Sequence, residues 1–245
     1  MIVKLNLNNR AFEAIINRTK KIEIRTNTDN HSYDNLKFND LIEFTNTENK
    51  KIMCRVVDIA HYQSAEELLM LEGTRYTTSS TNDYQEAIER IYSLNGYREK
   101  IKEHGVYAIH LEYLYKIDEV WNYLLEKCQS VLNPKKLSDS AEAGGVAAAI
   151  LTNSGNVYTG VCLDTACSLG FCAERNAIGN MITNGENNIN KLVCIGSSNN
   201  IMMPCGACRE LLMQISDNNK DMEILCNFET KETVKLKELM PRYWK

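Results

Sequence analysis

Two short cysteine motifs in the C-terminal half constrain the fold more than any other feature of the sequence. Cys172 lies in Gly-Phe-Cys-Ala-Glu-Arg-Asn-Ala, and Cys205 and Cys208 lie in Met-Pro-Cys-Gly-Ala-Cys-Arg-Glu. Cys205 and Cys208 are three residues apart, so both thiols face the same side at the start of a helix. Residues 172–183 form a second apolar, helix-like stretch with Glu174 in its first turn. A fold that brings these two helix starts together creates a site with three thiolates and one carboxylate.

A site of this composition fits a catalytic zinc ion. Three thiolates hold a tetrahedral Zn²⁺ and leave the fourth position for water, whereas structural zinc sites have four protein ligands. Zinc lowers the pKa of such a water to about 7, and a nearby carboxylate, here Glu174, can then carry its proton. All four histidines of the chain lie before residue 111, so the second half has to use thiolates. The alternatives are a structural zinc knot or unrelated buried cysteines. Pro204 before the pair and Glu174 after Cys172 favour the catalytic site.

The pattern Cys-Ala-Glu…Pro-Cys-x-x-Cys resembles the zinc-dependent cytidine deaminases, which remove ammonia hydrolytically from a cytosine-type ring. Members that use only cysteine include free-nucleoside cytidine deaminases and blasticidin S deaminases. The resemblance covers residues 117–245 and implies an α/β fold, a three-layer α/β/α sandwich. It also implies one Zn²⁺ per chain, held by Cys172, Cys205 and Cys208, with Glu174 as the catalytic proton carrier.

Two arginines stand next to the motif residues. Three thiolates leave the zinc site with a net negative charge, which helix N-termini at Cys172 and Cys205 partly offset. Arg175 and Arg209 are the candidate side-chain donors to the sulfurs.

The substrate is less well defined than the reaction. In nucleoside deaminases of this type an Asn-x-Glu follows the Thr-Gly-Val turn and binds the ribose. Here the same turn is followed by Cys162 and, two residues later, Asp164, which can still accept a hydrogen bond from a hydroxyl. The usual phenylalanine before the first strand is replaced by small residues at 142–145, and Phe171 offers ring contact instead. The candidate substrate-binding residues are Asp164, Cys162, Phe171 and Ala173. A nucleoside, a nucleobase and blasticidin S remain open as substrates.

Composition limits the class of partner. Residues 1–116 carry 16 Lys and Arg against 17 Asp and Glu, and residues 117–245 carry 12 against 15. Neither half has the basic footprint of a domain that binds a phosphate backbone, so we expect a small nucleoside-like substrate. RNA remains an alternative partner.

Cysteine usage and hydropathy predict the compartment. Nine cysteines, three of them assigned to metal, favour a reducing environment. The longest apolar run, residues 146–151, is too short to span a bilayer, and the alternating N-terminus has no signal-peptide pattern. We therefore expect a cytoplasmic protein. The small cysteine-only deaminases resemble one another in being tetramers, so we expect a homo-oligomer, a tetramer.

Hydrophobic periodicity in the C-terminal half predicts helices and strands that alternate. The helix from residue 117 ends at Asn133-Pro134, and residues 138–145 are expected as a loop of small residues. The expected strands are 146–152, 157–164, 192–197 and 223–228, and the expected helices are 172–183, 205–215 and a short one after 234. This order favours a layered α/β sheet.

Residues 1–116 are expected to form a separate domain. Strands are predicted at 1–7, 19–25, 41–44, 51–60 and 105–112, and helices at 11–17, 61–71 and 83–94. The order, with Ile-x-x-x-x-Lys-x-Ile-Glu-x-Arg and a closing Gly-Val-Tyr-Ala-Ile, resembles the ASCH domain, a PUA-like small β-barrel of α+β type.

The ASCH resemblance implies a second candidate site. Some ASCH relatives look like amidohydrolases that remove an acyl group from N4-acylated cytidine, and others are suggested RNA binders. Lys20 and Glu23 fall where such an activity needs a lysine and a polar strand residue, with Arg25 beside them and Glu72 as the best carboxylate. A lysine near a glutamate can act as base or nucleophile toward an amide. The simpler alternative is an exposed, salt-bridged strand face, worth about 1 kcal/mol or less.

Overall fold

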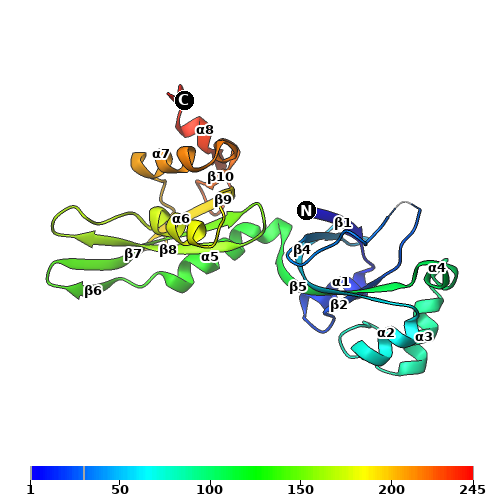
Figure 1. Cartoon of the computed structure of the whole chain (residues 1–245). Helices are drawn as coiled ribbons and strands as arrows, with labels where there is room; N and C mark the ends of the chain where they lie inside the picture. The colour runs from blue at the N-terminus through cyan, green and yellow to red at the C-terminus, as the bar shows by residue number, and fades with distance from the viewer. Residues whose placement is uncertain (1, 30, 245) are drawn as a thin grey trace. The chain divides into compact units, whose positions relative to one another are not determined.

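The computed structural model describes residues 2–29 and 31–244 of the chain. It divides into two compact units, one ending at Asp118 and the other beginning at Glu119 (Figure 1). Each unit has its own sheet and its own hydrophobic core. We describe them separately.

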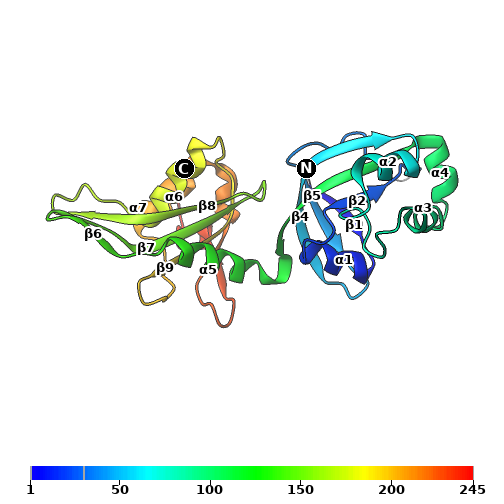
Figure 2. The ribbon, with the colours of Figure 1, turned by 90° about the horizontal axis from the view of Figure 1, so that it is seen from below.

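The N-terminal unit is built on a curled five-stranded sheet with the order β1-β3-β4-β5-β2 (Figure 2). The strands are β1 (Ile2–Asn6), β2 (Ile22–Arg25), β3 (Leu41–Thr45), β4 (Lys51–Tyr62) and β5 (Val106–Lys116). β1 and β3 are parallel, and the other pairs are antiparallel. β1 and β2 are the edge strands, so the sheet forms a half-barrel that is open between them.

Successive side chains of β5 serve two different cores, as the two-residue period of a strand requires. Ile109 and Leu111 pack with helix α1 (Asn9–Ile16) on one face of the sheet. Val106 and Ala108 pack with α2 (Ala65–Glu72), α3 (Tyr84–Tyr92) and α4 (Tyr97–His104) on the other face. β5 therefore carries apolar residues on both of its faces. For this reason its sequence does not simply alternate between apolar and polar residues.

The main differences between prediction and structure in the N-terminal half concern two helices, while the strand expected at 19–25 begins only at Ile22. The helix expected from residue 61 begins only at Ala65, because His61 and Tyr62 still pair with β5 and Ser64 caps the helix. Helix α4 was not predicted, because Ile101 is its one buried residue and the segment therefore lacks an apolar period.

The C-terminal unit has a mixed sheet with the order β11-β10-β9-β7-β6, and β8 also pairs with β7. The strands are β6 (Lys135–Ser138), β7 (Ala141–Thr152), β8 (Val157–Thr165), β9 (Ile189–Gly196), β10 (Glu223–Leu225) and β11 (Thr233–Lys235). β7 is central: β8 covers one of its edges, while β9 and β6 share the other.

Helices cover both faces of this sheet (Figure 1). They are α5 (Val120–Val131), α6 (Ala173–Thr183), α7 (Gly206–Ile215) and α8 (Leu236–Leu239), with 3₁₀ turns at Ile117–Glu119 and Asp217–Asp221. Ala148 and Ile150 of β7 share a core with α6 and α7. α5 lies on the opposite face, where the Cys128 thiol donates to the Val193 carbonyl at 3.5 Å. The predicted three-layer α/β/α sandwich is thus confirmed.

The loop expected at residues 138–145 is instead part of a hairpin. β7 begins at Ala141 and pairs first with β6, and its register shifts between Ala143 and Ala147. Gly144 has a φ of +79° at this bulge and lies against the Asn133 backbone, where a Cβ atom would not fit. The small residues that suggested a loop instead allow two backbone segments to pack closely at a bulge in a strand. Among the helices described, none has the length and apolar character needed to cross a membrane.

Candidate functional site

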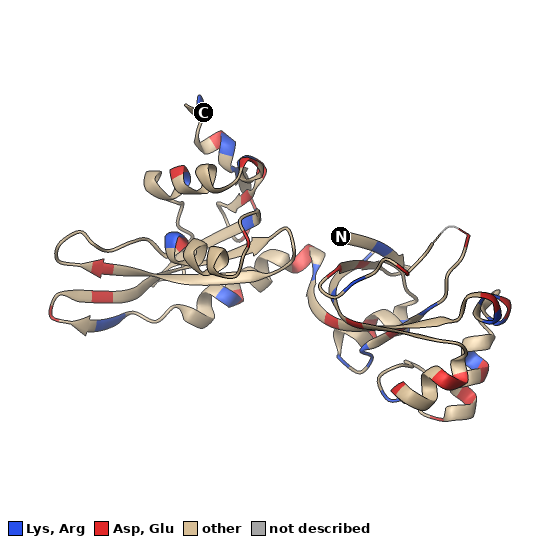
Figure 3. Ribbon diagram, in the orientation of Figure 1, with Lys and Arg blue, Asp and Glu red and all other residues tan. Residues whose placement is uncertain are grey.

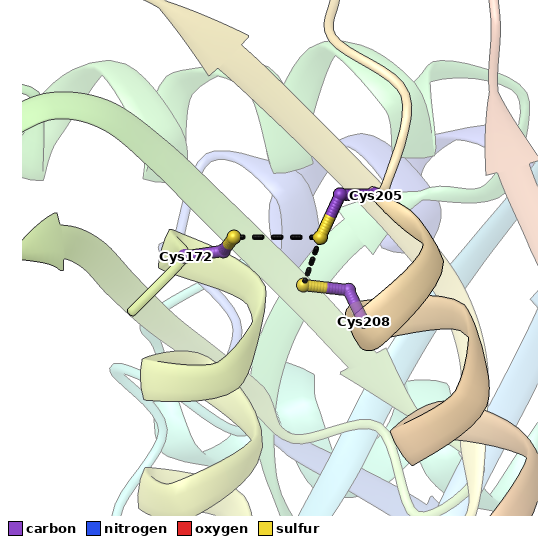
Figure 4. Close-up of side chains that lie close together, drawn as sticks. All are labelled: Cys172, Cys205 and Cys208. Carbon is purple, nitrogen blue, oxygen red and sulfur yellow. Dashed lines mark hydrogen bonds between the residues drawn. The ribbon is translucent and has the colours of Figure 1, made fainter. Parts of the chain in front are cut away.

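The three motif cysteines converge at the N-terminal ends of two helices. Cys172 is the N-cap of α6, Cys205 is the N-cap of α7, and Cys208 lies in the first turn of α7. The Sγ atoms of Cys172 and Cys205 lie 3.5 Å apart, and those of Cys205 and Cys208 also lie 3.5 Å apart (Figure 4). All three sulfurs are within 4.8 Å of one another. The structure thus brings both halves of the predicted motif together.

This arrangement fits a zinc ion. A Zn–S distance of about 2.3 Å in a tetrahedron requires sulfurs about 3.8 Å apart, close to the observed spacing. Cys208 is buried, Cys172 is partly buried and Cys205 is exposed, so the cluster opens on one side. Both helix N-termini add partial positive charge that favours thiolates. Zinc is therefore the cofactor of this unit.

Burial shapes the titration of the site. It raises the pKa values of the Cys172 and Cys208 thiols. Partial desolvation opposes thiolate formation at the exposed Cys205 too, but hydrogen bonds from the Cys208 and Ala207 amides and the neighbouring thiols lower the pKa of Cys205 overall. Metal binding supplies the charge that converts all three to thiolates.

Glu174 lies in the first turn of α6 and is 4% exposed. Burial raises the pKa of its carboxyl, and a hydrogen bond with the Cys208 thiol partly opposes that rise. The carboxyl group is therefore next to one of the candidate ligands and shielded from water. This is the position from which a carboxylate can exchange a proton with a molecule bound at the open side of the cluster.

Close packing of α6 on β8 holds Cys172 and Glu174 in place. A Cβ atom on Gly160 of β8 would lie 2.3 Å from the Ala177 nitrogen and 2.6 Å from the Ala173 carbonyl oxygen, so only glycine fits there. The Asn176 side-chain amide also donates to the Val161 carbonyl of β8 at 3.0 Å.

A cavity of about 300 Å³ opens beside the cysteines. Glu174, Cys172 and Cys205 line it, and so do all four predicted substrate-binding residues, namely Asp164, Cys162, Phe171 and Ala173. Five further lining residues were not predicted: Val146, Gly170, Cys194, Met202 and Met203. Of these five residues, Met202 and Met203 could have been predicted from the sequence. They lie directly before Pro204 and Cys205, and residues that precede a ligand in sequence also lie near the metal site.

Cys162 and Asp164 form a connected pair within the cavity. The Cys162 thiol accepts from the Val146 amide at 3.3 Å and donates to the Asp164 carboxylate at 3.3 Å. Burial raises the pKa of Cys162, which keeps it a thiol. Asp164 is exposed and retains acceptor capacity toward a ligand.

The N-terminal candidates form a second cluster along edge strand β2. The buried Lys20 ammonium donates to the carbonyls of Ile22 (2.6 Å) and Thr77 and is 3.4 Å from a Glu23 oxygen. The other Glu23 oxygen is 3.0 Å from the Arg25 guanidinium. Burial lowers the pKa of Lys20, while Glu23 opposes that shift. All three side chains line a cavity of about 410 Å³.

Glu72, the carboxylate expected beside Lys20, lies elsewhere. It accepts from the Tyr62 hydroxyl at 2.7 Å and lies 3.1 Å from His110 Nε2, and it does not line the β2 cavity. His110 pairs with Ile22, whereas Glu23 pairs with Ile109, the residue of β5 just before His110. Successive strand residues point to opposite faces, so the two carboxylates lie on opposite sides of the sheet. In the structure, Glu23 is the carboxylate partner of Lys20.

Comparison with known proteins confirms the family expected for each half of the chain. Residues 122–222 match the cytidine and deoxycytidylate deaminase zinc-binding region, and residues 5–115 match the ASCH domain. Blasticidin-S deaminase from Bacillus cereus is 31% identical over 106 residues, which cover 39% of this chain and 74% of that protein. The chain belongs to the cytidine deaminase family.

Other members of the cytidine deaminase family match over shorter stretches. Cytidine deaminase from Sporosarcina psychrophila is 29% identical over 75 residues, 30% of this chain. The chain spans about half the length of the curated relatives of this kind, 55% for that protein and 53% for cytidine deaminase from Mycobacterium tuberculosis. The crystal structure of cytidine deaminase from Mycobacterium leprae matches with 24% identity and a TM-score of 0.42, covering 50% of this chain and 98% of that one.

Arg175 and Arg209 were expected to donate to the cysteine sulfurs, but their side chains lie elsewhere. The Arg209 Nε donates to the Pro204 carbonyl at 2.7 Å, which braces the turn before Cys205. Arg175 is exposed on α6. Within the described part of the chain, neither arginine lines the cavity or bonds to a sulfur.

Proposed function

We propose that this chain hydrolyses the exocyclic amine of a cytosine-type ring, converting it to a carbonyl and releasing ammonia. The observation that carries the proposal is a cavity lined by Glu174 and by Cys172 and Cys205, two members of a three-sulfur cluster that fits zinc. When bound, Zn²⁺ supplies a Lewis acid that lowers the pKa of water. The net reaction consumes one water molecule and releases one molecule of ammonia.

Each residue of the cavity has a role in this proposal. Glu174 accepts the proton of the attacking water and returns it to the departing amine, and its burial keeps that proton from exchanging with solvent. Phe171 and Met202 provide apolar surface for a planar ring. Asp164 accepts a hydrogen bond from a hydroxyl of the substrate at the exposed side of the cavity.

We propose cytidine or deoxycytidine as the substrate, with uridine or deoxyuridine as the product. A cavity of about 300 Å³ is at the lower end of the range for small-molecule sites, and suits one nucleoside better than a polymer. The alternative within the same chemistry is a blasticidin S-type antibiotic. The similarity to blasticidin-S deaminase from Bacillus cereus, which covers 74% of that protein, supports this alternative.

The experiment is a screen for ammonia release from cytosine, cytidine, deoxycytidine and blasticidin S. We expect turnover of one or more of them, and Glu174→Gln should reduce it about 10²–10⁴-fold, since an amide cannot carry the proton. Glu142→Gln is the matched control, because Glu142 is exposed on β7 and does not line the cavity. Full activity in the Glu174→Gln protein would contradict the assignment.

A second proposed function concerns the β2 cavity, which we propose binds N4-modified cytidine, and deacylates it when the modification is an acyl group. The supporting observations are the ion pairs that link Lys20, Glu23 and the half-buried Arg25, and the Arg25 Nε, a buried donor atom without a partner among the described residues. A buried donor of this kind is suited to bind an acceptor atom of a ligand. RNA binding is the alternative; the even charge balance of residues 1–116 does not favour it.

We propose that the chain assembles as a homo-oligomer, a tetramer, in the cytoplasm. Leu169 is 80% exposed next to the deaminase cavity, and Met202 and Met203 are each more than one third exposed. An apolar rim of this kind is suited to contact with a neighbouring subunit. A monomer by light scattering at micromolar concentration would contradict the assembly. The nine cysteines favour a reducing compartment.

A further inference from the structure

The N-terminal unit has a second cavity that neither candidate function uses. Its volume is about 550 Å³, and it adjoins the β2 cavity: Thr78, Ser79 and Ser80 line both. Arg18, Arg75 and further hydroxyl and amide side chains line the rest of this outer cavity, and no carboxylate does. The wall between the two cavities is thus a single segment of the loop formed by residues 74–82.

This loop has a defined conformation. The Thr74 hydroxyl donates to the Asn82 carbonyl at 2.8 Å, which closes the two ends of the loop. The Thr77 and Thr78 amides both donate to the Thr74 carbonyl at 3.2 Å. The Lys20 ammonium holds the Thr77 carbonyl from the side of the β2 cavity. The loop residues that line the outer cavity are therefore held in position before any ligand binds.

The outer cavity combines many hydrogen-bond donors with two cationic side chains and no carboxylate. In the described part of the chain, Arg18 and Arg75 have no carboxylate partner, and Arg75 lies over the Tyr76 ring at 5.2 Å. The backbone amides of residues 79–82 have no partner among the described residues. Successive unbonded amides beside guanidinium groups form the kind of concavity that binds anions.

Two carboxylates that follow the loop in sequence, Asp83 and Glu86, have other partners. Glu86 accepts from the Thr81 hydroxyl and from Arg90 at 2.6 Å, so its charge is already balanced. Asp83 caps α3 by accepting from the Glu86 amide at 2.8 Å. Neither residue lines the outer cavity. An anion there would gain two guanidinium groups without facing an unpaired carboxylate.

We propose that the outer cavity binds the phosphate group of a nucleotide whose base and sugar lie in the β2 cavity. The placement of the base rests on the function proposed for the β2 cavity, whereas the phosphate site rests on the donors of the outer cavity alone. A phosphate monoester fits better than a polynucleotide, because acidic and basic residues are mixed throughout this unit (Figure 3) and a polymer needs a continuous basic surface.

Hydrogen exchange followed by mass spectrometry can test this site in the full chain. The Glu174→Gln background keeps the C-terminal cavity from consuming the ligand. Cytidine 5′-monophosphate should slow early exchange in peptides that contain residues 74–82, at a concentration at least tenfold lower than cytidine requires. Arg18→Gln and Arg75→Gln should each raise the concentration needed for half-protection about tenfold, the effect of losing one charge-assisted contact. Arg10→Gln should have no effect, because Arg10 lines neither cavity.

Each other result overturns part of the inference. Unchanged exchange with millimolar cytidine 5′-monophosphate would remove the phosphate site, and the deaminase proposal would stand if wild type still released ammonia. Equal protection by inorganic phosphate alone would overturn the assignment of a nucleotide. Tighter protection by a 5′-hydroxyl oligocytidylate than by the monophosphate would replace the monoester with RNA.

Discussion

The Sγ atoms of Cys172 and Cys205 lie 3.5 Å apart although 33 residues separate them in the chain. Each cysteine caps a helix, and β9 (Ile189–Gly196) connects the end of α6 to the segment before α7. The site therefore depends on how two helices begin at one region of a sheet, and not on a single loop. Changes that shift either helix start should therefore alter the spacing of the sulfurs.

The metal site makes a stoichiometric prediction. The purified protein should contain one zinc per chain, and Cys208→Ala should reduce the zinc content to near zero, because two sulfurs cannot hold a tetrahedral ion tightly. Elemental analysis measures this directly. Cys167→Ala is the control, since Cys167 is exposed and does not line the cavity. Retention of zinc by the Cys208→Ala protein would show that the ligands lie elsewhere.

Gly160→Ala should destabilise the C-terminal unit by about 1–3 kcal/mol, the usual cost of overpacking. The new Cβ atom would meet the α6 backbone at 2.3 Å, so the helix must move away from β8. Gly179→Ala is a matched control on α6, because its Cβ atom would have nothing within 4 Å and alanine favours helix. Urea unfolding followed by tryptophan fluorescence reports on this unit, since Trp121 and Trp244 are the only tryptophans. Equal midpoints for the two variants would contradict the close approach.

Glu186 predicts a pH dependence of stability. Burial alone would raise its pKa, but hydrogen bonds from Ser154, Asn156 and Tyr158 lower the pKa below 4.5 overall. A carboxyl with a lowered folded pKa contributes stability that is present above pH 4.5 and is lost as pH falls through the folded value. Glu186→Gln should therefore lower the thermal midpoint at pH 7, and the difference from wild type should shrink below pH 4.5. A difference that stays constant across this range would exclude the mechanism.

The zinc half of the site could be predicted from the sequence because its chemistry requires particular residues at fixed positions. Cys205 and Cys208 had to share one helix face, and Glu174 had to follow Cys172 within a turn. Met202 and Met203 were missed because their contact with the cavity depends on the path of the segment before α7, which no period encodes. β6 was missed because its exposed, basic residues resemble a loop.

Strand register is the main reason why the N-terminal site was only partly predicted. The sequence placed Lys20, Glu23 and Arg25 on one strand, and the structure has them together. Whether Glu72 joins them depends on which residue of β5 faces Glu23. A shift of one residue reverses every side chain. That pairing is set by tertiary contacts that lie far apart in the sequence.

The fusion of the two units predicts consecutive reactions on one base. Water would first cleave the N4-acyl amide, giving cytidine and a carboxylic acid, and a second water would then convert cytidine to uridine and ammonia. Tethering raises the local concentration of the shared intermediate, as it does for any second intramolecular event. Lys20 is the candidate base or nucleophile for the first step, and Glu174 carries the proton in the second.

The measurement is product analysis after incubation with N4-acetylcytidine. Wild type should yield uridine, Glu174→Gln should accumulate cytidine, and Lys20→Ala should leave the substrate unreacted while still deaminating free cytidine. Because Glu23 contacts Lys20 at 3.4 Å and Glu72 bonds to Tyr62 and His110, Glu23→Gln should slow deacylation more than Glu72→Gln does. Thermal unfolding of each variant separates lost chemistry from lost structure. If wild type deaminates cytidine but leaves the acylated nucleoside intact, the β2 cavity binds a different ligand and the two units do not act in sequence.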